Sequence, residues 1–432
     1  MSLQETEINN IEELSPSKSI TYSPSPQQIP QSPDLPETSK SPKSPEIKQS
    51  PESPKLPLTT SSTSNMVKVS NILEDNGTMT FQIDNLNVSF INAIRRTILS
   101  DIPTVVFRTF PHEKNDAKFY KNTTRLHNEI LKQRLSCIPI HINDLSIPLD
   151  DFVVEIKMKN DTDTIMYVTT KDFKIKNTKS GNYLKQSEVA KIFPADPYTK
   201  DHIIFARLRP KISDDIEGEE LHIEAKMTIS NADEDGMFNV VSTCSYSMTP
   251  DANKQNAEWN NYEKKIKSEE IYNEEDIEDI KKNWYLLDAK RFYKPDSFEF
   301  ILKSIGVFDN NEIMKKACNI LIKKIDDFIS VIDSQTIEIK DAETVMTSFD
   351  IVLENEDYTL GKVFEYGLHK KYYEDDMVFD FVGFRKLHPH DNHSIIRVSF
   401  ANNNGNKDAL YGYLKDVAIY TKTYFQNIKN QF

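Results

Sequence analysis

Two apolar-periodic segments, far apart in the chain, constrain its fold most strongly. The first, INAIRRTILSDIPTVVF from Ile91 to Phe107, begins with apolar residues at three- and four-residue steps, which predict a helix with one buried stripe. The second, DYTLGKVFEYGL from Asp357 to Leu368, repeats that spacing after an aspartate that is a good N-cap. The two stripes comprise Ile91, Ile94 and Ile98, and Leu360, Val363, Phe364 and Leu368. Since each stripe needs an apolar partner, we expect two like-folded halves packed helix to helix.

Strand patterns flank both helices. Val67–Leu73 and Thr78–Ile83 alternate around Asn76-Gly77, which is a strong hairpin signal. Further strands are predicted at 104–107, 298–302, 336–339, 348–353, 378–385 and 394–400, and further helices at 311–329 and from Leu410 to Ile428. Each half is therefore predicted to be an antiparallel sheet with helices on one face, which is an α+β fold.

A long segment of different character separates the two halves of the first sheet. Residues 111–294 carry β-branched runs at Phe152–Ile156, His202–Leu208 and Leu221–Ile229, which predict a mostly-β region. Within it, the acidic stretch Ser268–Asp279 is most simply a solvated loop. A docking surface for a basic partner is the alternative for that stretch.

The first 65 residues differ in composition from the rest of the chain. They contain eight Ser-Pro dipeptides and few large apolar residues, so this tail cannot bury enough surface to offset the entropy of ordering. We expect a disordered tail of polyproline character. It is either a solvated spacer or a segment tuned by phosphorylation, because each serine before a proline is a potential kinase target.

Charge and composition exclude several classes of protein. The net charge of −14 opposes direct binding of duplex DNA, which requires clustered Lys and Arg. No apolar run is long enough to span a bilayer, and the N-terminus lacks a signal-peptide pattern, so we expect a soluble intracellular protein without membrane partners. The three cysteines are too sparse for a disulfide framework, and Cys318 lies on the apolar stripe of its predicted helix.

No catalytic, cofactor-binding or metal-binding residue is predicted. The 10 glycines fall in no phosphate-loop spacing. Asn231–Gly236 imitates the start of an EF-hand loop, but the twelfth position is Ser242 rather than a glutamate. The most metal-like cluster, His388-Pro389-His390-Asp391-Asn392-His393, has no cysteine or further acidic partner nearby in sequence. We do not expect this cluster to hold a metal.

Five sequence motifs, in order, resemble the alpha family of RNA polymerase assembly subunits, which includes bacterial alpha, the archaeal D-type subunits and their eukaryotic counterparts. The signature-helix motif is Asn92-Ala93-Ile94-Arg95-Arg96 followed by Leu99-Ser100-Asp101-Ile102-Pro103. RLHNEILKQRLSCIPI, Arg125–Ile140, resembles the next helix of the family, and GMFNVVSTCSYSMTP, Gly236–Pro250, resembles the strand pair that closes its inserted domain. Phe298–Ile325 is similar to the strand and long helix that complete the D-type fold. YTLGKVFEYGL and Phe381–Val398 resemble the archaeal L-type subunits and their small eukaryotic relatives.

This resemblance implies a division of the chain. Residues 1–65 are the tail, 66–110 and 295–333 form a discontinuous D-like dimerisation domain, 111–294 form an inserted domain, and 334–432 form an L-like dimerisation domain. The D-type and L-type proteins are normally separate polypeptides, whereas here only Ile332–Thr336 separates them, so the pair resembles a fused intramolecular heterodimer. Such a fusion, in a chain rich in Asn, Ile and Lys, resembles a polymerase component of a giant DNA virus. Its location would then be the virion and the host cytoplasm, with the nucleus left open.

The chain departs from the family pattern at two places. Where the L-type helix usually carries Asn and Arg, this chain has Lys362 and Glu365, so the resemblance supports the fold better than the contacts of that helix. Some D-type relatives carry a four-cysteine zinc or iron–sulfur site in the inserted domain. With only Cys137 and Cys244 in that region, the site cannot be complete here.

The resemblance implies a non-catalytic assembly platform for DNA-dependent RNA polymerase. Its partners would be the largest and second-largest subunits and other small subunits, with DNA contacted only through the complex. Arg95, Arg96 and Asn92 are the predicted partner-binding residues, because an arginine fork pairs well with carboxylates or carbonyls across an interface. The alternative is that one arginine only closes an internal salt bridge. A regulatory binding module or an enzyme that reuses the fold is the second hypothesis.

Overall fold

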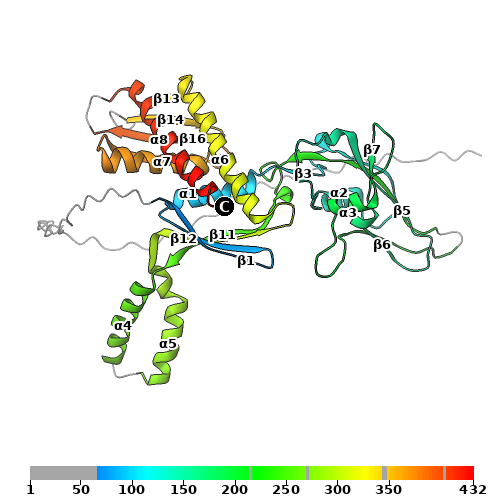
Figure 1. Ribbon diagram of the computed structural model, residues 1–432, viewed down its shortest axis with the longest axis horizontal. Coiled ribbons are helices and arrows are strands. Elements are labelled where there is room, and N and C mark those ends of the chain that lie inside the picture. The colour runs from blue at the N-terminus through cyan, green and yellow to red at the C-terminus, as the bar shows by residue number, and fades with distance from the viewer. Residues whose placement is uncertain (1–65, 214–216, 269–271, 343–347, 402–404) are drawn as a thin grey trace, which may run out of the picture. The chain divides into compact units, whose positions relative to one another are not determined.

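The computed structural model describes residues 66–213, 217–268, 272–342, 348–401 and 405–432 (Figure 1). The predicted Ser-Pro tail lies outside these residues. The first strands, β1 (Lys68–Asp75) and β2 (Thr78–Asp84), form the predicted hairpin. Its turn residues Asn76 and Gly77 have φ values of 49° and 72°. Positive φ at both central positions is what a two-residue hairpin turn of this twist requires.

The first sheet is antiparallel and has the order β1-β2-β12-β11, with β11 at Val241–Pro250 and β12 at Tyr293–Ser304. Helix α1 (Val88–Ser100) packs against β11, and helix α6 (Asn310–Asp333) packs against β12 and α1. We predicted that 236–250 forms a strand pair closing the inserted domain. That was wrong, because Gly236–Phe238 is a 3₁₀ turn capped by Asp235, and β11 is a single strand of the first sheet.

The second sheet repeats the first. Its strands are β13 (Ile339–Asp341), β14 (Ser348–Glu354), β15 (Phe379–Arg385) and β16 (His393–Phe400), in the order β13-β14-β16-β15. Helix α7 (Tyr358–Leu368) follows the second strand, continues as a π-helical segment at His369–Asp375, and α8 (Lys407–Lys429) follows the fourth strand. Both halves therefore consist of a hairpin, a helix, two more strands and a long helix, with the same order of strands.

The first strand of this sheet begins later than predicted. We expected it at 336–339, but β13 starts at Ile339. The backbone N–H and the hydroxyl of Thr336 donate to the carbonyl of Val331 at the end of α6, and Gln335 has a φ of 52°. These residues therefore finish the helix instead of starting the strand.

The inserted region has its own core. Its main sheet has the order β4-β9-β5-β7, with β4 at Ala117–Asn122, β9 at Glu220–Lys226, β5 at Phe152–Lys159 and β7 at Lys174–Asn177. Two strand pairs accompany it: β3 (Thr104–Val106) with β10 (Thr228–Ser230), and β6 (Met166–Thr169) with β8 (Ile204–Leu208). The helices are α2 (Asn128–Ser136) and α3 (Gln186–Ile192), with 3₁₀ turns at His112–Lys114, Leu149–Asp151 and Thr170–Asp172. The single strand predicted at 221–229 is thus two strands, separated at Met227.

A helical hairpin joins β11 to β12. Helices α4 (Ala252–Ser268) and α5 (Glu274–Leu286), followed by a 3₁₀ turn at Asp288–Arg291, enclose a small core around Trp259 and Trp284, whose ring centroids are 5.6 Å apart (Figure 1). Residues 274–279, predicted as loop, are helical, because the Asn273 side chain caps α5 and acidic residues suit a first helical turn. The predicted range 111–294 for an inserted domain therefore contains this hairpin and β11 as well as the separate core.

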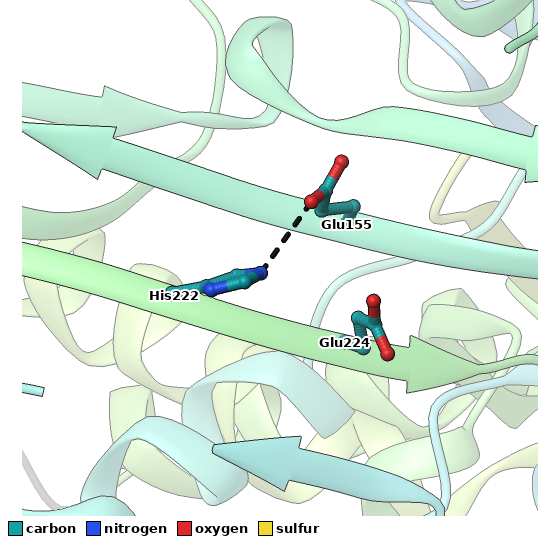
Figure 2. Close-up of side chains that lie close together, drawn as sticks. All are labelled: Glu155, His222 and Glu224. Atoms are coloured by element: carbon teal, nitrogen blue, oxygen red, sulfur yellow. Dashed lines mark ion pairs between the residues drawn. The ribbon is translucent and has the colours of Figure 1, made fainter. Parts of the chain in front are cut away.

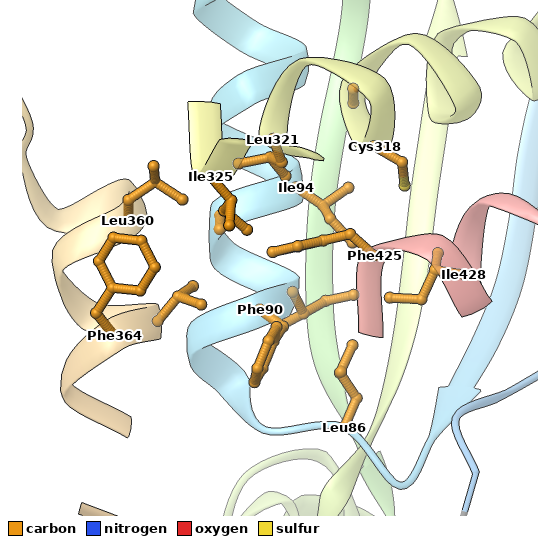
Figure 3. Close-up of a cluster of buried hydrophobic side chains, with 14 of the residues drawn as sticks. Leu86, Phe90, Ile94, Cys318, Leu321, Ile325, Leu360, Phe364, Phe425 and Ile428 are labelled. Carbon is orange, nitrogen blue, oxygen red and sulfur yellow. The ribbon is translucent and has the colours of Figure 1, made fainter. Parts of the chain in front are cut away.

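One apolar core joins the two halves (Figure 3). Helix α1 packs against α7, and α6 packs against α8. Phe364 of α7 stacks on Phe328 of α6 with centroids 4.5 Å apart, and Phe90 of α1 lies 5.4 Å from Phe425 of α8. Each stripe residue named from the sequence is at most 1% exposed: Ile91, Ile94, Ile98, Leu360, Val363, Phe364 and Leu368. Cys318 is also buried in this core, as its position on a helical stripe predicts.

Candidate partner-binding site at the junction of the two halves

Helix α1 presents its polar side chains beside its buried stripe. The helix begins at the Asn87 cap, whose side chain accepts a hydrogen bond of 2.9 Å from the N–H of Ser89. The apolar stripe faces the shared core, which leaves Asn92, Arg95 and Arg96 half-buried at its border. The structure thus places the three predicted partner-binding residues on one short stretch of helix.

Arg95 has a neutral partner within the chain. Its Nε and Nη2 atoms donate to Oδ1 of Asn92 at 3.1 and 2.9 Å. Within the described ranges, no carboxylate lies within ion-pair distance of this guanidinium. Beneath it, Cys244 faces the carbonyl of Arg95, and burial raises the pKa of this thiol to about 12. Arg95 is therefore a positioned, partly exposed positive charge that no carboxylate among the described residues neutralises.

Arg96 links the two halves. Its guanidinium forms an ion pair with Asp357 and donates to the hydroxyl of Thr359 at 2.9 Å. Asp357 also caps α7, because its Oδ1 accepts from the N–H of Thr359 at 2.8 Å. Burial would raise the pKa of Asp357, but the hydrogen bonds from Thr359 and the charge of Arg96 hold it below its ordinary value. Arg96 thus closes an internal salt bridge of the kind that the sequence raised as an alternative for one arginine.

A polar cleft of about 640 Å³ opens beside this ion pair. Its walls come from both halves, at the end of α1, the middle of α6, the turn before α7 and the loop between β15 and β16, and from the segment after β10. Lys324 of α6 pairs with Asp101 at 2.8 Å on one side, and Lys386 and His390 contribute to the other. The cleft therefore exists only where the two halves meet.

Glu356 is a charged residue of the cleft that its neighbours do not neutralise. In the described part of the chain, its carboxyl makes no hydrogen bond or ion pair. Burial, together with the negative charges of Asp357 and Asp101, raises its pKa to about 7, although Lys324 acts in the opposite direction. Glu356 was not predicted from the sequence. Its position directly before a helix cap was the only local signal, and its charged neighbours include residues from distant segments.

The two residues of α7 that depart from the family pattern find their partners within the second half. Lys362 and Glu365 form an ion pair on α7, and Glu365 also accepts from the backbone N–H of Phe384 at 3.2 Å. This acid therefore braces α7 against β15.

The histidine cluster at 388–393 is held by local hydrogen bonds. Asp391 accepts from the N–H of His388 at 3.0 Å, and the N–H of His390 donates to Nδ1 of His388 at 3.2 Å. Among the described residues, the group whose ligand atoms could hold a metal lies elsewhere, at Glu155, His222 and Glu224. No described helix is both long and apolar enough to cross a bilayer.

Comparison with known proteins agrees with the fold. Residues 80–325, more than half of the chain, match the family described as the RNA polymerase Rpb3/Rpb11 dimerisation domain. The chain belongs to this family. The predicted resemblance to the alpha-like polymerase subunits and the predicted α+β fold are thereby confirmed.

Curated relatives are polymerase subunits of archaea and eukaryotes. The chain is 26% identical over 287 residues to DNA-directed RNA polymerase subunit Rpo3 of Pyrococcus horikoshii, covering 61% of this chain and 97% of that protein. It is 23% identical over 201 residues to subunit RPAC1 of DNA-directed RNA polymerases I and III of Saccharomyces cerevisiae, covering 40% of this chain and 54% of that protein. RPAC1 of Homo sapiens is 24% identical over 200 residues, covering 41% and 53%.

Proposed function

We propose that this chain is a non-catalytic assembly platform of a DNA-dependent RNA polymerase. Its first half is the Rpo3-type (D-type) dimerisation unit, and its second half is an L-type partner fused to it. The family membership and the similarity to Rpo3 and RPAC1 subunits support the polymerase role. The Pyrococcus, yeast and human relatives are cellular proteins, and the resemblance to a giant-virus component stays a prediction.

The shared core of two repeated halves is the observation that carries the fusion proposal. The family match ends at residue 325, so the second half needs its own support. That support is its identical strand order and its equivalent helices, with α7 corresponding to α1 and α8 to α6. Equivalent helices meet in pairs, α1 with α7 and α6 with α8. This pairing is what an isologous dimer of like domains has, here formed within one chain.

The partner-facing residues we propose are Arg95 and Asn92 of α1. Asn92 holds the guanidinium in place while its charge stays unneutralised. A fixed guanidinium pairs well with carboxylates or carbonyls of a partner, and little side-chain entropy is lost when it is already ordered. We assign this contact to the second-largest catalytic subunit. Arg96 supports it indirectly by joining α1 to the start of α7.

Capture of the large subunits tests this proposal. The full chain, Arg95→Ala and the control Arg291→Ala are each co-expressed with the two largest polymerase subunits. Arg291 is the matched control because its side chain is 80% exposed on the helical hairpin. We expect Arg95→Ala to weaken capture by roughly 2 kcal/mol, which is about 30-fold.

The melting temperature separates the site from the fold. Arg95→Ala should melt within about 1 °C of the parent, because a partly exposed charge with no ion pair among the described residues contributes little to the stability of a monomer. Equal capture by Arg95→Ala, Arg291→Ala and the parent would show that Arg95 does not contribute to the interface. Failure of the parent chain to bind either large subunit would overturn the platform role itself.

A further inference from the structure

Three potential metal ligands lie together on the polar face of the β4-β9-β5-β7 sheet (Figure 2). Glu155 is on β5, and His222 and Glu224 are on β9. In the register of these strands, Glu155 is directly opposite Glu224. His222 is two residues before Glu224, so its side chain is on the same face of the sheet.

This arrangement places two carboxylates side by side, and each has a lysine opposite it on the outer strand: Lys118 for Glu224 and Lys174 for Glu155. Like charges directly opposite each other on neighbouring strands are destabilising. Among the described residues, no lysine or arginine lies within ion-pair distance of Glu155 or Glu224. The ion pair that Glu155 does form joins its Oε1 to Nε2 of His222 at 3.4 Å, and it requires a protonated imidazole. The two acids therefore share a place where a cation would be stabilised.

The imidazole directs one ring nitrogen into this group. Nε2 of His222 is shielded from solvent and makes no hydrogen bond, and its contact with Oε1 of Glu155 at 3.4 Å is an ion pair only when the ring is protonated. A shielded polar atom without a hydrogen bond is costly. This nitrogen and one oxygen of each carboxylate all lie within 4.8 Å of one another. Small side-chain rotations would bring three such atoms onto one ion, since zinc–ligand distances are about 2.0–2.2 Å.

Two tyrosine side chains contact the three candidate ligands. The hydroxyl of Tyr183 donates to Oε2 of Glu155 at 2.6 Å, and that of Tyr120 donates to Oε2 of Glu224 at 2.7 Å. The ring of Tyr120 also stacks on His222, with centroids 4.8 Å apart. One oxygen of each carboxylate stays available, while the other is fixed. Hydrogen bonds of this kind orient the ligands in established metal sites.

We propose that Glu155, His222 and Glu224 form a binding site for a divalent transition-metal ion of the zinc class. An imidazole nitrogen with two carboxylates is a zinc-type ligand set, whereas calcium and magnesium prefer oxygen ligands alone. The ion has three ligands from the protein and a fourth position open to water or to a partner's side chain. It crosslinks β5 to β9 on the exposed face of the inserted region. This site is independent of the proposed platform role.

Zinc binding to the full-length chain tests the proposal. The chain is stripped with a chelator, dialysed, and titrated with Zn²⁺ alone by calorimetry, with bound metal measured by elemental analysis. We expect one equivalent of zinc to bind and to persist in excess Mg²⁺. His222→Gln and Glu224→Gln should each abolish stoichiometric binding. Tyr183→Phe should weaken it by roughly 10- to 100-fold, because it removes only an orienting hydrogen bond.

Two control variants identify the site. His127→Gln removes an exposed histidine that also lies beside a glutamate, with 2.8 Å between Nδ1 of His127 and Oε2 of Glu129. His390→Gln removes a member of the histidine cluster in the loop between β15 and β16. Both should bind zinc like the parent. The proposal is overturned if the parent binds no stoichiometric zinc, or if the controls lose zinc while His222→Gln retains it. Circular dichroism of each variant verifies its fold, and Co²⁺ in place of Zn²⁺ should give a visible spectrum that His222→Gln lacks.

Discussion

The ionisation of a single residue, Glu356, should make the free energy of unfolding depend on pH. Its pKa of about 7 lies above the ordinary 4.5 because the carboxyl is largely removed from water and lies near the negative charges of Asp357 and Asp101. Between these two pH values, the carboxyl of Glu356 is therefore protonated in the folded protein and ionised in the unfolded chain. The free energy of unfolding should fall as pH rises from about 4.5 to 7, and the full penalty is present above that window.

Replacing this acid by its neutral amide should remove the penalty. We expect Glu356→Gln to raise the free energy of unfolding at about pH 8 by roughly 1 to 3 kcal/mol, and to leave it nearly unchanged at about pH 4.5. Urea denaturation at both pH values measures this. Glu354→Gln, two residues earlier and exposed, is the matched control and should show no pH-dependent gain. An equal change in the free energy of unfolding at both pH values would show that the effect of Glu356→Gln does not come from the charge of Glu356.

Single residues were predictable from sequence only where the cause is local. The stripe positions on both helices follow from helical periodicity, and all of them are buried. The role of Arg96 does not follow from periodicity, because its partner Asp357 is 261 positions away. Glu356 and the Glu155–His222–Glu224 group were missed for the same reason. Their properties arise from neighbours that only the folded chain brings together.

Close packing between α7 and α8 depends on one glycine. A Cβ added to Gly367 would lie 2.5 Å from Cγ1 of Val417 and 3.2 Å from Cγ2 of Thr421, both on α8. Gly412, on α8 itself, is exposed and has no atom within 4 Å of the equivalent position. The two glycines are therefore a matched pair for testing this contact.

Opposite effects on stability are expected from alanine at these two sites. Gly367→Ala overpacks the helix contact and should lower the free energy of unfolding by roughly 1 to 3 kcal/mol. Gly412→Ala should raise it by about 0.5 to 1 kcal/mol, because alanine loses less backbone entropy in a helix. Thermal or urea denaturation distinguishes the two signs. A stabilising Gly367→Ala would mean that α7 and α8 can separate enough to accept a methyl group.

Element type was more predictable than element partners. The cap at Asp357 and the Asn76-Gly77 turn act within a few residues, and the helix and hairpin that they predict are present. β11 was predicted as part of a strand pair that closes the inserted domain, whereas it pairs with β12, which follows the helical hairpin of α4 and α5. Strand pairing is set by contacts distant in sequence, so no local pattern could place β11.

At the scale of the whole molecule, the two halves share one apolar core. The core that spans them draws on α1 and α6 from the first half and on α7 and α8 from the second. Polar contacts also cross between the halves: Lys422 to Asp326 and Lys415 to Asp333, both at 2.5 Å, and the Gln431 side chain to the backbone N–H of Val69 at 2.8 Å. The segment that connects them, Ser334–Thr336, is exposed. The two halves are therefore held together by their interface and not only by this short connecting segment.

Cutting the chain within this connection should leave the complex intact. We expect fragments 66–334 and 335–432, when co-expressed, to co-purify as a one-to-one complex, because burial of the shared core holds them together. Phe364→Asp in the second fragment should abolish co-purification, since it places an unpaired charge in a position that is 1% exposed. Phe381→Asp is the matched control, because Phe381 is 50% exposed and its replacement should leave the complex intact. Separate elution of two folded fragments would contradict the intramolecular heterodimer, since the peptide connection alone would then hold the halves together.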